Sequence, residues 1–244
     1  DRRFSASIWI NVVGAFAILG NAIMMTQYLQ SVLSYSPLSA ALWSLLPAVF
    51  IGAAAPAAAT GSVRFGRPPT IIVGLLVAAG GFIVLASLTT VHSLAVVLVG
   101  ATLLACGTVA VSAVITDYVV GVAPVERAGA TSSLLETSSE FGGAFGIAIL
   151  GSVLNAVYRW SFDDTAFADT PAARSLSGAL ATAHGLGAEQ THHLMAVARS
   201  AFVDGLSAAA WVGAAVLLAT AALAAWALRG PSEHAVTQEH AAAE

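Results

Sequence analysis

The sequence predicts an all-α integral membrane protein with six transmembrane helices, and two observations carry this prediction. First, hydrophobic residues make up 58% of the 244 residues and charged residues only 9%, with a mean hydropathy of +0.85. A soluble domain carries about 25% charged residues, so this chain lacks the polar surface to cover a globular core. Second, six continuous apolar runs reach the roughly 20 residues that cross a bilayer, without the period-two alternation of barrel strands.

The arginines orient these runs. The expected spans lie at about 7–33, 38–63, 70–88, 94–120, 129–157 and 201–228. The ends and loops on one side carry Arg2, Arg3, Arg64, Arg67, Arg127 and Arg229, whereas the loops at 34–37 and 89–93 carry none. The positive-inside rule therefore predicts that both ends of this segment are cytoplasmic. The chain begins with Asp1 rather than Met, so we expect it to be part of a longer polypeptide.

The first span carries four pliable or polar side chains on one helical face. Asn21, Met24, Met25 and Tyr28 recur at i, i+3, i+4 and i+7. An amide, two thioethers and a phenol suit a substrate-lining surface for varied apolar ligands. The alternative is a helix–helix contact in which the Asn and Tyr side chains hydrogen-bond a neighbouring helix. Both interpretations stay open.

The middle spans carry weaker signals. Pro47 and Pro56 predict a bent second span, which is tolerated where neighbours satisfy the freed backbone groups. Cys106, the only cysteine, is expected to be a small buried hydrophobe. Asp117 falls roughly 34 Å along the fourth span, near the cytoplasmic boundary. It is expected either to pair with an inner-loop arginine such as Arg127 or to serve a proton pathway.

The fifth span contains the most informative pattern, because two acids lie within an apolar run. Glu136 and Glu140 are one turn apart, roughly 12 and 18 Å from the inner end, and they share a face with Gly143. The adjacent stripe of small residues consists of Ser139, Gly142 and Gly146. A charge in hydrocarbon costs at least roughly 2.5 kcal/mol. We therefore expect the glycines to pack against another helix and the acids to point into the bundle interior, exchanging protons or recognising a cation.

The outer loop at 158–200 and the tail at 230–244 are polar. Within this loop we expect short surface helices at 172–180 and 189–199, and we expect the tail to be disordered. His192 and His193 are adjacent and point to different helix faces, which argues against a metal site. No catalytic set, phosphate loop or basic patch accompanies these features, so an enzyme, a cofactor and a nucleic-acid partner are not expected.

Two patches of the sequence carry a resemblance to a known family. The first patch is residues 27–30, Gln-Tyr-Leu-Gln, followed by Tyr-Ser-Pro at 35–37 and Leu-Pro at 46–47. The second runs from Ala-Pro-Val-Glu-Arg-Ala-Gly-Ala at 123–130 into Glu-Thr-Ser-Ser-Glu-Phe-Gly-Gly-Ala-Phe-Gly at 136–146. Both patches resemble the fourteen-helix drug:proton antiporters of the major facilitator superfamily. The resemblance covers residues 1 to about 229 and is strongest to actinobacterial exporters of quaternary ammonium compounds, methyl viologen and fluoroquinolones.

The resemblance implies the C-terminal six-helix half of a transporter in a bacterial plasma membrane. An N-terminal half bundle of the same polypeptide, a small-molecule substrate and a proton gradient as the energy source are implied with it. By position, Glu136 resembles the membrane-embedded acid of the family's corresponding helix. Two departures stand out: the turn at Arg64–Arg67 lacks the family's frequent acid, and Ser34 stands where Gly often precedes Tyr-Ser-Pro. Export of an endogenous metabolite or lipid, and a non-transporting scaffold or sensor, remain alternatives.

Overall fold

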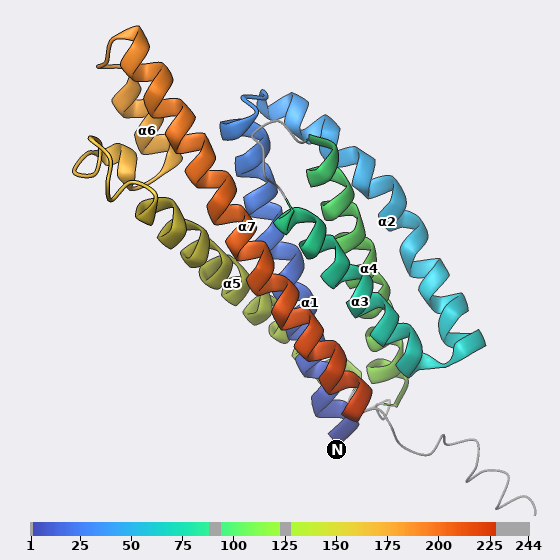
Figure 1. Ribbon diagram of the computed structural model, residues 1–244. Coiled ribbons are helices and arrows are strands. Elements are labelled where there is room, and N and C mark those ends of the chain that lie inside the picture. The colour runs from blue at the N-terminus through green and yellow to red at the C-terminus, as the bar shows by residue number, and fades with distance from the viewer. Residues whose placement is uncertain (1, 88–93, 123–127, 228–244) are drawn as a thin grey trace, which may run out of the picture.

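The computed structural model describes residues 2–87, 94–122 and 128–227, and in this part of the chain every regular element is helical (Figure 1). The all-α class is confirmed. The long helices are α1 (Arg2–Gln27), α2 (Pro37–Phe65), α3 (Arg67–Ala86), α4 (Leu94–Val122), α5 (Ala128–Trp160) and α7 (Ala188–Ala227). A π-helical turn, η1 (Tyr28–Val32), extends α1, and η3 (Pro171–Ala173) and α6 (Leu176–Ala183) are short. Six of these segments are long and apolar enough to cross a membrane.

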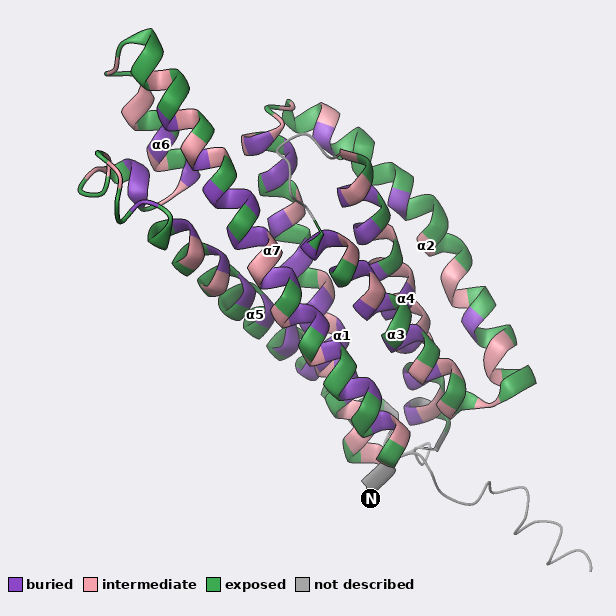
Figure 2. Ribbon diagram, viewed as in Figure 1, coloured by how far each residue is buried: buried purple, intermediate pink, exposed green. Residues whose placement is uncertain are grey.

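Four of the long helices form two closely packed pairs, and α7 contacts both pairs. Helix α1 packs along α5, α3 packs along α4, and α7 contacts α1, α3 and α5 (Figure 1). Helix α2 lies at the periphery against α4 and exposes most of its surface (Figure 2). Only 11% of its most apolar 18 residues are buried, compared with 50% in α1. The bundle therefore has a well-packed interior and one apolar helix left largely on its outside.

Glycines set the close approach of α3 and α4. A Cβ atom on Gly81 would lie 2.5 Å from the backbone nitrogen of Leu104, and one on Gly107 would lie 2.5 Å from that of Ala78. Backbone atoms, unlike side chains, cannot rotate away. Small residues at such points let two membrane helices meet at backbone distance, which maximises their van der Waals contact.

The turn between η1 and α2 depends on Ser34. Ser34 has φ +57°, the left-handed region that residues with a Cβ rarely adopt. Its hydroxyl accepts a hydrogen bond from Nη2 of Arg199 on α7 at 3.1 Å. The backbone conformation explains physically why glycine suits this position, as the resemblance suggested, and the arginine contact offsets part of the strain.

Ser34→Gly is expected to be more stable than Ser34→Ala. Neither variant can accept the hydrogen bond from Arg199, so the comparison isolates the backbone conformation. Alanine at a positive φ should be less stable than glycine by about 1 kcal/mol. Thermal unfolding of the purified protein in detergent measures the difference, and equal melting temperatures for the two variants would contradict a left-handed Ser34.

The connection between α2 and α3 is built by proline and glycine. Helix α2 runs without a break through Pro47 and Pro56, and Thr60 Oγ1 donates to the carbonyl oxygen of Pro56 at 2.9 Å. It ends at Phe65, and the following residue, Gly66, has a φ of +92° at the turn into α3. Two prolines in the first turn of α3 then preset the helical φ where no intrahelical N–H bond is needed.

The segment at 158–200 is folded around its own small core. Tyr158 donates a hydrogen bond to the carbonyl oxygen of Ala172 at 2.9 Å, and its ring lies 5.1 Å from that of Phe162. Helix α7 begins at Ala188 and continues for 40 residues. The separate helix expected at 189–199 and the span expected at 201–228 are therefore one element. The expected loop at 89–93 and tail at 230–244 lie outside the described residues.

Candidate functional site: a polar cavity beside Glu140

Helix α5 meets α1 through its glycine stripe. A methyl group on Gly142 would overlap the carbonyl oxygen of Val12, and one on Gly146 would overlap that of Phe16. Gly143 lies against the side chain of Leu19. The three glycines named from the sequence thus all lie at the α1–α5 contact, and this contact fixes the rotation of α5 about its axis.

Asn11 joins the same two helices by hydrogen bonds. Its side chain is buried, and Nδ2 lies 3.0 Å from the carbonyl oxygen of Leu135, 2.8 Å from Ser138 Oγ and 2.9 Å from Ser139 Oγ. Two amide hydrogens serve these three acceptors. Sequence reasoning did not single out Asn11; the available signal was an amide in an apolar run, level with the serines of α5.

Next to this hydrogen-bonded group lies a cavity of about 250 Å³ between α1, α4 and α5. Its polar lining consists of Asn11, Thr108, Ser112, Ser139 and Glu140. The hydroxyl of Thr108 is already bonded to carbonyl oxygens of its own helix. Glu140 is the one ionisable residue among the lining residues. The cavity can therefore offer a small ligand one carboxyl group with neutral hydrogen-bonding neighbours.

The position of the two acids corrects the expectation that they point into the bundle interior. Glu136 and Glu140 are both exposed in the six-helix bundle, and only Glu140 lines the cavity. The physical reason is the adjacent glycine stripe. Gly142 and Gly146 must face α1. The helical face that carries Glu136 and Glu140 is next to the glycine face, so the two acids lie at the edge of the α1–α5 contact. Glu140 borders the cavity there, and Glu136, one turn towards the start of α5, does not.

The cavity lies well inside the membrane-spanning region. Glu140 is 12 residues from the start of α5, about 18 Å along its axis. Asn11 is nine residues from the start of α1, about 14 Å along. Measured from helix starts at the membrane boundary, these distances are roughly half of a hydrocarbon core about 30 Å thick. A carboxyl group at this depth needs water, a proton or a partner.

The side chains on the first span lie elsewhere. Asn21, Met24 and Tyr28 are buried in the bundle, and Met25 is half-buried. None of the four lines the cavity beside Glu140. In the bundle as it stands, their burial favours the helix–helix contact over the substrate-lining surface.

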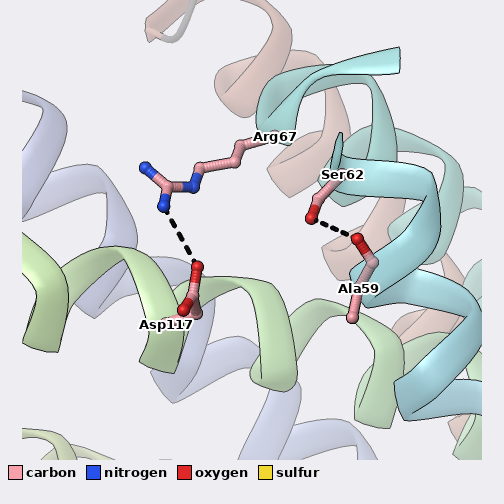
Figure 3. Close-up of polar contacts among 4 residues, drawn as sticks. All are labelled: Ala59, Ser62, Arg67 and Asp117. Atoms are coloured by element: carbon pink, nitrogen blue, oxygen red, sulfur yellow. Dashed lines mark hydrogen bonds and ion pairs between the residues drawn. The ribbon is translucent and has the colours of Figure 1, made fainter. Parts of the chain in front are cut away.

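Asp117 does not line this cavity either and lies five residues beyond Ser112, near the last turn of α4. Its Oδ2 lies 3.1 Å from Nη2 of Arg67 (Figure 3). The guanidinium of Arg67 also lies 5.5 Å from the ring centre of Tyr118. Arg127, the partner expected from the sequence, lies outside the described residues. Both charged side chains are substantially exposed, at 46% and 70%, so the pair contributes at most about 1 kcal/mol. It ties the α2–α3 turn to α4.

The part of the chain that the structure describes contains no group of three or more His, Cys, Asp or Glu side chains that could hold a metal ion.

Asn11→Leu is expected to weaken the α1–α5 contact by about 0.6–1.7 kcal/mol, the range for hydrogen bonds between membrane helices. The matched control is Asn155→Leu, because Asn155 is exposed on α5 and should tolerate the change. Thermal unfolding in detergent, monitored by circular dichroism, compares the two. Equal losses in both variants would mean that the Asn11 bonds contribute nothing specific.

Comparison with known proteins yields relatives among exporters. No family model matches the chain. It is 32% identical over 231 residues to the multidrug efflux pump LfrA of Mycolicibacterium smegmatis, covering 93% of the chain and 46% of the pump. It is 27% identical over 246 residues to the tetracenomycin C resistance and export protein of Streptomyces glaucescens, covering 96% and 46%. It is 30% identical over 156 residues to the multidrug resistance protein Stp of Mycobacterium tuberculosis, covering 64% and 29%. The chain thus spans about half the length of the first two relatives, and these relatives are transporters rather than enzymes.

Proposed function

We propose that this chain is the C-terminal bundle of a proton-coupled drug exporter of the major facilitator type. The bundle would work in a bacterial plasma membrane with both its ends in the cytoplasm. The names of the relatives support drug export. The observation that carries the proposal is the position of Glu140, a carboxyl group on the rim of a polar cavity and about 18 Å along a helix long and apolar enough to cross a membrane.

The exposed acids support a second bundle as a partner. Glu136 and Glu140 cannot face hydrocarbon without a cost of at least roughly 2.5 kcal/mol each. The first two relatives are more than twice as long as the aligned part. Each therefore has a further part of similar length that is available to cover this face of the bundle. We propose that the N-terminal half of the same polypeptide covers it, with a water-filled substrate pathway between the halves. Rocking of the two halves would expose Glu140 to each side in turn.

The proposed coupling follows from carboxyl chemistry. A carboxyl group away from bulk water favours its protonated form, and a cation within about 4–6 Å favours the ionised form. A lipophilic cation that enters the cavity would therefore displace the proton from Glu140. Once the pathway opens outward, an external proton would displace the cation. Asn11 and Ser139 hold the helix that carries Glu140, and Ser112 faces the same cavity.

Drug export is tested in everted membrane vesicles that contain the full polypeptide. Addition of a respiratory substrate should drive uptake of a lipophilic cationic dye such as ethidium, and an agent that collapses the pH gradient should release it. Vesicles without the polypeptide are the control. Uptake that persists after the pH gradient collapses would contradict proton coupling, and no dye uptake would contradict export of this substrate class.

Export of a natural product is a second candidate. It is favoured by the relative from Streptomyces glaucescens, which is named for the export of tetracenomycin C. The cavity is compatible with a neutral natural product, because Glu140 is its one ionisable lining residue and the other lining residues are neutral. Competition distinguishes the candidates. A neutral polyketide that blocks ethidium uptake shares its pathway, whereas a cation-specific site would leave uptake unchanged.

A further inference from the structure

A second cavity lies on the opposite side of α4 from Glu140, between α2, α3 and α4. Its volume is about 570 Å³, more than twice that of the polar cavity. The walls are small and apolar and include Ala54, Ala57 and Gly61 of α2 and Gly74 and Gly107 from the α3–α4 contact. Cys106 also contributes to the wall. We call this space the α2 groove.

The dimensions of the α2 groove match one leaflet of a bilayer. It follows α2 from Ala54 to its last residue, Phe65. Eleven helical steps of 1.5 Å give a length of about 17 Å, and half of a hydrocarbon core about 30 Å thick is about 15 Å. Val73 and Val77 border the groove and are exposed, as is Ala57. The groove is therefore open to the surroundings of the bundle.

The side chain of Arg64 lies at the end of the α2 groove. The guanidinium of Arg64 lies 5.5 Å from the ring centre of Phe65, and this ring is part of the groove wall. Asp117 pairs with Arg67 instead, and within the described residues no carboxylate pairs with Arg64. At the level where α2 ends, the mouth of the groove thus combines an apolar channel with an arginine that has no carboxylate partner among the described residues.

We propose that the α2 groove binds an anionic phospholipid, with one acyl chain along α2 and the phosphate on Arg64. The wall favours a hydrocarbon occupant, because only Thr70 and Cys106 among the lining residues carry a polar side chain and the Thr70 hydroxyl already donates to the carbonyl oxygen of Gly66. The unpaired arginine selects the headgroup by charge. The site is separate from the Glu140 cavity, and the inference requires only that the bundle spans a membrane.

The test is native mass spectrometry of the full polypeptide released from vesicles of equal parts phosphatidylglycerol and phosphatidylcholine. We expect one phosphatidylglycerol to be retained. Arg64→Gln should lower its retention by about fivefold, the effect of one cation near a membrane surface, and Arg64→Lys should restore it. Ala57→Phe should remove the lipid by filling the groove. Arg174→Gln is the matched control, because Arg174 is exposed but lies outside the groove.

Alkylation of Cys106 by N-ethylmaleimide gives an independent readout in the same vesicles. Phosphatidylglycerol should slow the reaction in the native protein more than in Arg64→Gln, and Cys106→Ala supplies the reaction blank. Equal retention of the two lipids, or native retention in both Arg64→Gln and Ala57→Phe, would overturn the proposal. Equal alkylation rates with and without phosphatidylglycerol would do the same.

Discussion

Gly146→Ala is expected to disrupt the α1–α5 contact although it adds only one methyl group. The methyl would overlap the carbonyl oxygen of Phe16, and this atom belongs to the backbone of α1. Relief requires the two helices to separate, and overpacking of this kind costs about 1–3 kcal/mol or more. Because α1 and α5 enclose the Glu140 cavity with α4, their separation should also reduce transport. Thermal unfolding in detergent and the yield of monodisperse protein measure the effect.

Gly151→Ala is the matched control. Gly151 lies on the same helix, is exposed, and a Cβ added there would meet no atom within 4 Å. Alanine should stabilise the helix by up to about 1 kcal/mol relative to glycine at either position. The difference between the two variants therefore isolates the α1 contact. If Gly146→Ala proved as stable as Gly151→Ala, the glycine stripe would not be the packing surface.

Glu140→Gln is expected to lower proton-driven drug export by about tenfold or more, equivalent to about 1.4 kcal/mol of lost interaction. Glutamine keeps the shape of the side chain but neither releases a proton nor attracts a cation. Glu136→Gln should have a smaller effect, because Glu136 does not line the cavity. The measurement is the initial rate of ethidium uptake in everted vesicles, normalised to the amount of protein.

This pair of variants also separates two lines of reasoning. The family resemblance implies a role for Glu136, whereas the cavity geometry favours Glu140. A larger loss of export in Glu136→Gln than in Glu140→Gln would contradict the geometry and favour the resemblance. Glu140→Asp should retain partial export, because it preserves the ionisable group in a shorter side chain.

The sequence was sufficient for the fold class because membrane burial leaves a strong compositional signal. Uncharged apolar runs of about 20 residues are typical of helices that cross a bilayer. The small-residue stripe through Gly142 and Gly146 was also readable, because residues four apart share a helical face. The sequence did not predict that α1 packs against this stripe, because periodicity identifies a helical face but not the helix that covers it.

The acid face shows this limit most clearly. Glu136 and Glu140 were expected to point inward because a charge avoids lipid, but the argument left open which protein surface would shield them. In the described bundle the glycines occupy the interior contact and the acids lie at its edge. Asn11 was missed for a related reason. A single amide in an apolar run becomes informative only when its acceptors, in Asn11's case on α5, are known.

Proton release on drug binding tests the role of Glu140 most directly. The full polypeptide in detergent, in a weakly buffered solution with a pH-sensitive dye, is titrated with ethidium, and the protons released per bound dye are counted. We expect the native protein and Glu136→Gln to release protons as ethidium binds, and Glu140→Gln to bind with little or no release. Unchanged proton release in Glu140→Gln would contradict the assignment of Glu140 as the coupling residue.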